Sequence, residues 1–328
     1  MLKLGSITLE VPFFQASLSG YSDYAMRRLA MDYGSPLVFA GVMLAKSVNH
    51  PKIISKRTFR PEEDEHPIGA QLLGDEPQAM ADAARVLVGA GYDLIDLNFA
   101  CPAPKVLRRR RGGFLLNKPQ TVMEIYRKVR ESVNCPVLMK LRTGFDNDSA
   151  GAENFWDICR QASADGIDAI IVHPRTVLQK FKGTADRRVL GELKRQFPRT
   201  TIIGSGDLFS AASAVELLKT SGIDGVVIAR GAVGNPWIFR ELRAALEGMP
   251  LPGPPDLEEQ GRVVLAHFEM LCGLYQAGKA VGHFRKFIVN YCKFHPQRKA
   301  ARIALLAAND RNQMLAAIEL WYGVKAFN

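Results

Sequence analysis

Eight short apolar runs alternate with amphipathic stretches over residues 13–247, and this alternation limits the fold more than any other feature of the sequence. Each run is rich in Val, Ile, Leu or Phe and has the length of a buried strand. Strands that alternate with helices form parallel sheets, and eight such units are typical of a closed barrel. We therefore predict an α/β fold, a (β/α)8 TIM barrel, with strands at Phe13–Ala16, Leu37–Ala40, Ile68–Leu72, Leu94–Leu97, Val137–Leu141, Ala169–Val172, Thr201–Ile203 and Gly225–Ile228.

A proline- and glycine-rich segment at 248–255 follows the predicted barrel. Such a segment cannot continue a helix and is typical of a stiff linker. After it, Asp256 is predicted to cap a helix, with Glu259 as its capping-box partner. We therefore predict a barrel domain at 1–247, a linker at 248–255 and a small helical bundle at 256–328. The bundle carries a set of cations: Lys279, Arg285, Lys286, Lys293, Arg298, Lys299 and Arg302.

The chain has 43 Lys and Arg against 33 Asp and Glu, a formal net charge of +10. A surplus of this size suggests a polyanionic partner such as a nucleic acid. Lys105 and the run Arg108–Arg111 follow Cys101 closely, so we expect this positive charge beside the predicted site. Five cysteines without paired spacing indicate a reducing compartment, and neither an export signal nor a membrane-length apolar run is present. We expect a cytoplasmic monomer that does not associate with membranes.

Polar residues follow the strands, which is where parallel barrels place their active sites. The loops after the last two predicted strands contain Gly204-Ser205-Gly206-Asp207 and Ala229-Arg230-Gly231. In barrels these two loops form the usual phosphate site, with backbone N–H groups facing the anion. Glycine permits close approach, and the guanidinium of Arg230 can bind phosphate bidentately. The alternative is a pair of tight turns with a surface arginine.

Three further side chains at successive strand ends suit a flavin. Lys140 can neutralise the flavin edge that becomes anionic on reduction. Gln71 can both donate to and accept from a planar heterocycle, and His173 can hydrogen-bond to a flavin or a phosphate. Each alone is more often structural. Together, opposite a phosphate site, they predict an FMN pocket and no metal site.

Cys101 follows the apolar strand Leu94–Leu97 in the sequence Asp96-Leu97-Asn98-Phe99-Ala100-Cys101-Pro102. It has three interpretations: an inert buried thiol, a nucleophile or a general acid. Beside a flavin that donates hydride, a thiol that donates a proton is the natural complement for reducing a carbon–carbon double bond.

These motifs together resemble the tRNA-dihydrouridine synthase family. The similar segments, in the family's order, are 96–102, Lys105-Val106 with Gly112-Gly113, 139–144, 172–176, 181–183, 206–207 and 230–237, matching about residues 10–240. The resemblance implies FMN as cofactor, NADPH (or NADH) as reductant, and reduction of the C5–C6 double bond of uridine in tRNA.

The resemblance also implies roles for individual residues. It assigns Gln71, Lys140, His173, Gly206, Ala229 and Arg230 to FMN, and we add Ser17, Leu18, Ser205 and Asp207 from the same loops. It assigns Asn98 to the uracil and Cys101 to protonation of C5. We expect Lys105, Arg142 and Arg175 to contact the substrate.

The chain departs from the family at four places. The family has Ala-Pro-Met-Ala-Gly after the first strand, where this chain has Ala16-Ser17-Leu18-Ser19-Gly20, so flavin contacts there are expected from the backbone. Gly41 replaces a glutamate, Ala100 the glycine before the cysteine, and Pro174 the glycine after the histidine. We interpret the chain as a divergent bacterial-type member.

Three functions compete at this point. The first is dihydrouridine formation in tRNA, or the same reaction in ribosomal RNA. The second is an FMN barrel acting on a small molecule, similar to dihydroorotate dehydrogenases or ene-reductases. The arginine run and basic tail argue against it, because a small metabolite needs neither. The third is an RNA-binding protein without catalysis.

Overall fold

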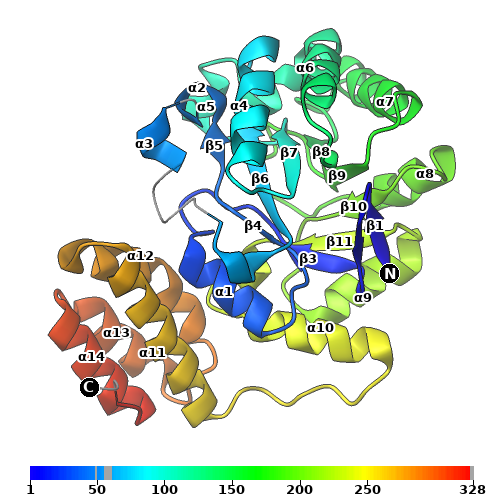
Figure 1. Cartoon of the computed structure of the whole chain (residues 1–328). Coiled ribbons are helices and arrows are strands. Elements are labelled where there is room, and N and C mark those ends of the chain that lie inside the picture. The colour runs from blue at the N-terminus through cyan, green and yellow to red at the C-terminus, as the bar shows by residue number, and fades with distance from the viewer. Residues whose placement is uncertain (49, 55–60, 326–328) are drawn as a thin grey trace.

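The computed structural model describes residues 1–48, 50–54 and 61–325, and its centre is a parallel barrel of eight strands (Figure 1). Around the barrel they lie in the order β3-β11-β10-β9-β8-β7-β6-β4. The N–H of Gln15 donates to the carbonyl of Leu37 at 3.2 Å, which joins the two ends of this order. The predicted fold class and all eight strand positions are confirmed: β3 (Phe13–Gln15), β4 (Val38–Phe39), β6 (Ile68–Leu73), β7 (Leu94–Asn98), β8 (Val137–Arg142), β9 (Ala169–His173), β10 (Ile202–Gly204) and β11 (Gly225–Ile228). A short extra strand, β5 (Met43–Leu44), pairs with β6 beyond β4.

Helices cover the outside of the barrel, and local sequence explains their ends. In α9 the side chain of Ser210 accepts from the N–H of Ser213, and Gly222 ends the helix at φ +67°. In α4 the carboxylate of Glu76 caps a helix that begins at Pro77. The α-helices of the barrel region are α1 (Tyr24–Asp32), α2 (Ala45–Val48), α3 (Pro51–Ile54), α4 (Pro77–Gly89), α5 (Pro104–Leu107), α6 (Pro119–Ser132), α7 (Ser149–Ala164), α8 (Arg188–Gln196), α9 (Ala211–Ser221) and α10 (Trp237–Glu247). Three 3₁₀ turns accompany them: η1 (Glu63–Glu65), η2 (Gly112–Asn117) and η3 (Arg230–Ala232).

An antiparallel hairpin, β1 (Leu2–Leu4) with β2 (Ile7–Leu9), closes the N-terminal end of the barrel. Its Leu2, Leu4 and Leu9 are buried in one cluster with inward-facing strand residues such as Phe14 and Val227. This hairpin was not predicted from the sequence. By sealing one end of the barrel, it leaves the opposite end for the site.

The chain from 248 to 256 forms neither helix nor strand, and the tail that follows packs against the barrel (Figure 1). The tail helices are α11 (Leu257–Leu274), α12 (Ala277–Tyr291), α13 (Arg298–Ala307) and α14 (Arg311–Tyr322). Helix α11 lies against α1, and buried tail residues share one hydrophobic core with the barrel helices. The last three residues of the predicted domain at 256–328 lie outside the described residues. Within the described chain, no helix has both the length and the apolar character of a membrane span.

The predicted capping box at the start of α11 is only half present. Asp256 caps the helix by accepting from the N–H of Glu259 at 2.7 Å. The carboxylate of Glu259 turns away and accepts hydrogen bonds from Trp237 (3.1 Å), Arg240 (2.8 Å) and Tyr33 (3.2 Å) of the barrel region. Because three donors of the barrel region surround this carboxylate, Glu259 contacts them and does not complete the capping box. Glu259 therefore connects the tail to the barrel.

We expect Glu259→Ala to destabilise the protein by about 1.5–3 kcal/mol, because hydrogen bonds to a charged group are lost and the buried indole N–H of Trp237 loses its partner. The measurement is urea unfolding followed by circular dichroism. Glu258→Ala is the matched control: that side chain is exposed and pairs with Arg262 of its own helix. Its effect should stay within about 0.5 kcal/mol. Equal effects of the two variants would contradict the docking role.

Candidate active site

A cavity of about 700 Å³ opens at the carboxyl ends of the barrel strands, on the side of the tail. Asn290 and Lys293 of the tail contribute to its wall. Its size and position are those of ligand sites in barrel enzymes. All ten predicted cofactor residues line it: Ser17, Leu18, Gln71, Lys140, His173, Ser205, Gly206, Asp207, Ala229 and Arg230. Cys101, Asn98 and Arg142 line it as well, whereas Lys105 and Arg175 do not.

A chain of hydrogen bonds runs beneath the cavity from the Cys101 loop to a buried carboxylate. The Oδ1 atom of Asn98 accepts from the N–H groups of Ala100 (3.1 Å) and Cys101 (3.0 Å). The Nδ2 of Asn98 donates to Oε1 of Gln71 at 2.6 Å. The Nε2 of Gln71 then donates to Oδ2 of Asp96, also at 2.6 Å. Strand register makes this possible, because Gln71 of β6 lies opposite Asp96 of β7.

A buried carboxyl group, Asp96, and a half-buried lysine, Lys140, lie at this end of the barrel. Burial raises the pKa of Asp96 to about 6, although the hydrogen bond from Gln71 and the charge of Lys140 act to lower it. Burial lowers the pKa of Lys140 to about 8, against the opposing effect of Asp96. At pH 7 the lysine is therefore a desolvated cation, a state that an anionic ligand would stabilise. Shifted pKa values in a cavity are typical of functional sites.

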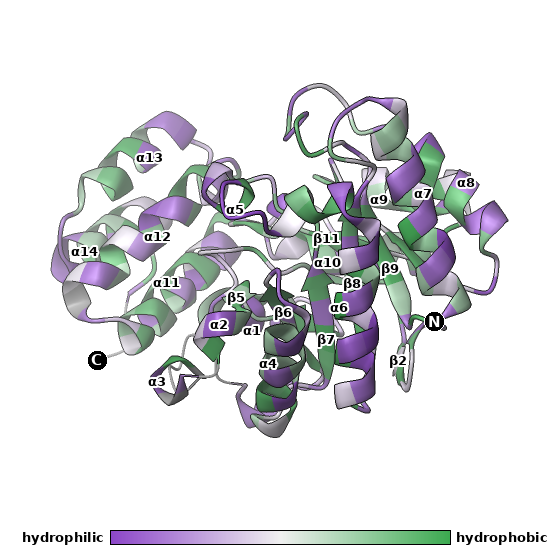
Figure 2. Ribbon diagram, turned by 90° about the horizontal axis from the view of Figure 1, so that it is seen from above, coloured by the Kyte–Doolittle hydropathy of each residue, from purple (hydrophilic) through white to green (hydrophobic). Residues whose placement is uncertain are grey.

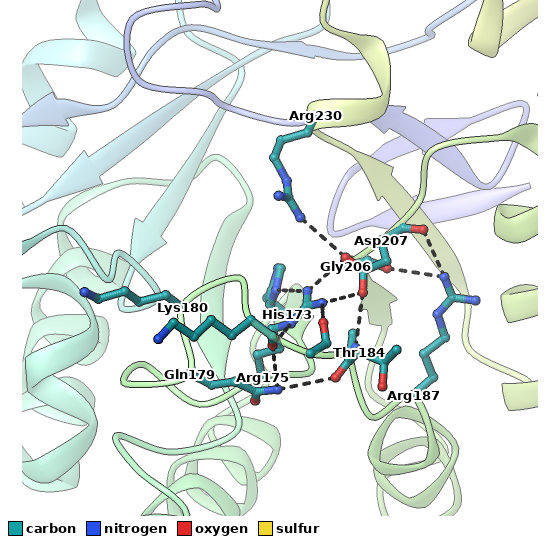
Figure 3. A network of polar contacts seen from close by, with 12 residues as sticks. His173, Arg175, Gln179, Lys180, Thr184, Arg187, Gly206, Asp207 and Arg230 are labelled. Carbon is teal, nitrogen blue, oxygen red and sulfur yellow. Dashed lines mark hydrogen bonds and ion pairs between the residues drawn. The ribbon is translucent and has the colours of Figure 1, made fainter.

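A polar network forms the wall between β9 and β10, with Arg175 at its centre (Figure 3). Arg175 pairs with the carboxylate of Asp207 through both terminal nitrogens, at 3.0 and 2.5 Å. Arg230 approaches the same carboxylate at 3.4 Å, and Arg175 also contacts Nε2 of His173 at 3.3 Å. Burial, followed by the charges of Arg142 and Lys140, lowers the pKa of His173 to about 2. His173 is therefore neutral at any physiological pH and acts here as a hydrogen-bonding group.

The network changes the interpretation of two predicted residues. Arg175 is buried, and besides Asp207 it donates to the backbone of Gly183 at 2.5 Å, so its guanidinium is not available to a substrate. Burial acts to raise the pKa of Asp207, but Arg175, the N–H of Ala185 and the charge of Arg230 outweigh it and lower that pKa. The carboxylate of Asp207 thus holds the wall together, and this side chain is not available to a ligand.

Arg142 is also committed to the protein. It is buried, and it donates to the carbonyls of Ala100 (2.9 Å), Thr176 (2.9 Å) and Lys180 (2.8 Å). Burial and the charge of Arg175 lower the pKa of Arg142 to about 10, while Cys101 acts in the opposite direction. The predicted substrate contact through its guanidinium is therefore not supported. Arg142 instead holds the loop that carries Cys101.

The same side of the cavity also has the features of an anion site. Ser205 is buried, and its hydroxyl has no hydrogen-bond partner in the described structure. Gly206 adopts φ +99°, which favours glycine, and Gly231 packs so closely on the carbonyl of Leu208 that a Cβ would lie 2.2 Å from it. The guanidinium of Arg230 lies over the ring of Phe181 at 4.5 Å and over that of Phe209 at 5.1 Å. Free donors and tight glycines on one wall are suited to a phosphate.

Cys101 is half-buried and lies in a loop supported from below by two glycines. The N–H of Gly113 donates to the carbonyl of Cys101 at 3.1 Å. A Cβ on Gly113 would lie 2.5 Å from Val177, so only glycine fits beneath the loop. With Asn98 and Arg142, these contacts hold the thiol at the cavity edge.

The arginine run next to this loop is not uniform. Arg108, Arg109 and Arg110 are exposed, and so is Lys105, which lies on α5 at the rim nearest the tail (Figure 2). Arg111 is half-buried and pairs with Asp75 at 2.7 Å. The run therefore presents three exposed cations, and the charge of its fourth member, Arg111, is neutralised by a carboxylate.

Three residues at the site were not predicted from the sequence. The role of Asp96 was missed, although an acidic residue within an apolar strand was a usable signal. Asn290 reaches the cavity only because the tail folds back over the barrel, and no local pattern indicates that. Phe209 follows Asp207, lines the cavity and is 53% exposed. An aromatic residue just after a strand gives no local signal that separates a cavity wall from the core.

This arrangement defines the class of protein: a β/α-barrel enzyme with a ligand-sized cavity at the carboxyl ends of its strands. Residues 14–323 match the model of the family described as Dihydrouridine synthase (Dus). The chain belongs to the dihydrouridine synthase family, as its motifs predicted.

Relatives and solved structures agree with this. A probable tRNA-dihydrouridine synthase of Mycobacterium tuberculosis is 34% identical over 99% of this chain and 86% of its own length. A tRNA-dihydrouridine synthase B of Pasteurella multocida is 32% identical over 98% of this chain and 96% of its own length.

Among solved structures, the histamine dehydrogenase of Rhizobium sp. 4-9 aligns over 82% of this chain and 50% of its own, at 13% identity and a TM-score of 0.56. A 2-naphthoyl-CoA reductase aligns over 76% of this chain and 52% of its own, at 14% identity and a TM-score of 0.58. The chain spans about half the length of these two proteins. The likeness shows a shared fold.

Proposed function

We propose that the protein reduces the C5–C6 double bond of uridine in tRNA to dihydrouridine, with FMN as cofactor and NADPH as reductant. The observation that carries the proposal is the meeting of Cys101, Asn98 and all ten predicted cofactor residues around one cavity in a member of this family. When bound, FMN supplies the hydride for the double bond and takes it from NADPH.

The residues present suit FMN. The unpartnered hydroxyl of Ser205, the tight glycines and Arg230 would hold its phosphate, with the backbone of Asp207 beside them. Lys140 would face the flavin edge that gains negative charge, and the neutral His173 would hydrogen-bond without adding a charge. Ser17 and Leu18 line the same cavity and would contribute through their backbone.

Cys101 would supply the proton to C5 of the uracil, and Asn98 would orient the base. Asn98 is already fixed by its hydrogen bonds to Gln71 and to the Cys101 loop, so it needs no rearrangement to present its remaining N–H. The thiol itself stands at the cavity edge, where a base that enters from the mouth would meet it.

A folded RNA would be held by the exposed cations on both sides of the mouth. Arg108, Arg109, Arg110 and Lys105 lie on the barrel side, and Lys286 and Lys293 on the tail side. Most of the binding free energy would come from these phosphate contacts, and the choice of base from the cavity.

The test is a reaction with FMN, NADPH and an unmodified tRNA transcript, followed by nucleoside mass spectrometry. The protein should bind FMN, turn yellow and convert uridine to dihydrouridine. Parallel reactions with ribosomal RNA and with small unsaturated carbonyl compounds should give no product. A protein that ignores added FMN, or product only in the parallel reactions, would contradict the proposal.

Lys140 makes flavin binding depend on pH. Burial lowers the pKa of this lysine to about 8, and a bound flavin would raise it because the ammonium gains a carbonyl acceptor for its hydrogen bonds. Affinity for FMN should therefore be constant from pH 7 to 8 and then fall, by up to about tenfold per pH unit until the pKa of the complex is reached. Fluorescence titration at pH 7 to 9.5 measures this. Lys140→Met should bind FMN more weakly at pH 7, and its affinity should not decrease above pH 8. A Lys140→Met variant whose affinity still decreases with pH would exclude Lys140 as the cause.

A further inference from the structure

The hydrogen-bond chain beneath the cavity has a fixed direction. It begins at two backbone donors, the N–H groups of Ala100 and Cys101, and it ends at Asp96, whose ionised carboxylate can only accept. The amides of Asn98 and Gln71 lie between them, and each could face either way if its neighbours permitted it. Here each amide uses its oxygen toward the cysteine loop and its NH2 toward the carboxylate.

This direction decides what the cavity offers to a ligand. One N–H of each amide is used within the chain, and both residues line the cavity, so each has a second N–H left for a ligand. The ammonium of Lys140 lines the same surface and also can only donate. The floor of the cavity is thus built of donors and suits a heterocycle edge made of carbonyl oxygens and unprotonated nitrogens.

We propose that Asp96 is a positioning residue: as the terminal acceptor of the chain, it makes Gln71 and Asn98 present N–H groups to the bound heterocycle and, through Asn98, holds the loop of Cys101. Asp96 does not line the cavity and would touch neither flavin nor base. The part of this inference that concerns flavin binding rests on the function proposed above.

The burial of Asp96 is consistent with such a role. Its Oδ1 has no hydrogen-bond partner in the described structure, and only Oδ2 is used, by Gln71. A buried carboxylate with one orphaned oxygen costs stability, so packing alone would favour an apolar residue at this place. Burial raises the pKa of this carboxyl to about 6, and at pH 7.5 it is ionised and can only accept.

Two substitutions separate the acceptor from the charge. Asp96→Asn removes the charge that faces Lys140 but keeps an oxygen that can accept from Gln71. Asp96→Leu removes both. Neither variant carries a charge, so the difference between them reports the hydrogen-bonding group at this position and not the charge. Asp93→Asn is the control, because Asp93 precedes the same strand at its other end and accepts from the N–H of Ile68 at 2.7 Å.

Two readouts at pH 7.5 test the proposal. The first is the dissociation constant of FMN, measured by fluorescence quenching. The second is the alkylation rate of Cys101 by iodoacetamide in the flavin-free protein, followed by peptide mass spectrometry. Asp96→Leu should bind FMN roughly tenfold more weakly than Asp96→Asn, about the value of one oriented hydrogen bond. It should also change Cys101 alkylation several-fold, whereas Asp93→Asn should match the wild type in both.

Gln71→Met is the last variant of the test, because it removes the side chain that connects Asp96 to Asn98 by hydrogen bonds. In this background the difference between Asp96→Asn and Asp96→Leu should disappear. If Asp96→Leu does not fold, Gln71→Met alone should still change Cys101 alkylation. The proposal is overturned if the Asn and Leu variants behave alike, or if their difference survives in the Gln71→Met background. If the wild type binds no FMN, the proposed cofactor is wrong, and the alkylation readout still decides the role of Asp96.

Discussion

Cys101→Ala should keep its flavin and its reduction by NADPH, yet lose the reaction with RNA. The thiol lies at the cavity edge, held by Asn98 and by Gly113, and it makes no contact on which the phosphate wall or Lys140 depends. Removing a general acid slows the step that needs its proton by about 10²–10⁴-fold. The measurement is reoxidation of pre-reduced enzyme by substrate tRNA, in single turnover.

The control for this prediction is a second half-buried thiol. Cys135 lies in the bend before β8 and not in the cavity lining, so Cys135→Ala should reoxidise at the wild-type rate. Cys159 and Cys292 are fully buried, and their replacement should affect stability more than turnover. A Cys101→Ala enzyme that reoxidises as fast as the wild type would show that another group donates the proton.

The barrel could be predicted because its strands are buried on both sides. Runs such as Ile68–Leu73 and Val137–Arg142 are almost continuously apolar, and the helices between them end at recognisable caps. The hairpin at the N-terminus was missed because each of its strands has only three residues, too few for a pattern to stand out. Its place under the barrel depends on contacts with residues far along the chain, such as Gly225, which lies against Leu2.

The residues that line the cavity were easier to predict than the contacts that each side chain makes. Strand ends of a parallel barrel converge, so residue types at those ends were enough to gather the cavity lining. The ion-pair partners of these residues could not be predicted in this way, because they lie on separate loops. Arg175 and Asp207 are 32 residues apart, and only folding reveals that each neutralises the other. In the same way, Glu259 fitted a local capping pattern but is used by Trp237 and Arg240.

Binding of tRNA should weaken steeply with salt, and the arginine run should account for a defined part of that slope. Each phosphate contact contributes about 0.7–0.9 to the slope of log K against log salt, depending on whether the contacted RNA is single-stranded or duplex. Replacing the exposed Arg108, Arg109 and Arg110 together by Ala should therefore reduce the slope by roughly two to three units. The measurement is filter binding or fluorescence anisotropy between 50 and 200 mM salt.

The fourth arginine is the internal control. The charge of Arg111 is already neutralised by Asp75 at 2.7 Å, and its side chain is only 14% exposed. Arg111 therefore should not displace a counterion when RNA binds, and Arg111→Ala should not change the number of counterions released. Its slope should equal that of the wild type, even if affinity changes through the loop that carries Cys101. Equal slopes for the triple variant and the wild type would place the RNA elsewhere on the surface. A reduced slope for Arg111→Ala would mean that RNA displaces Asp75, and the run would then act as four cations.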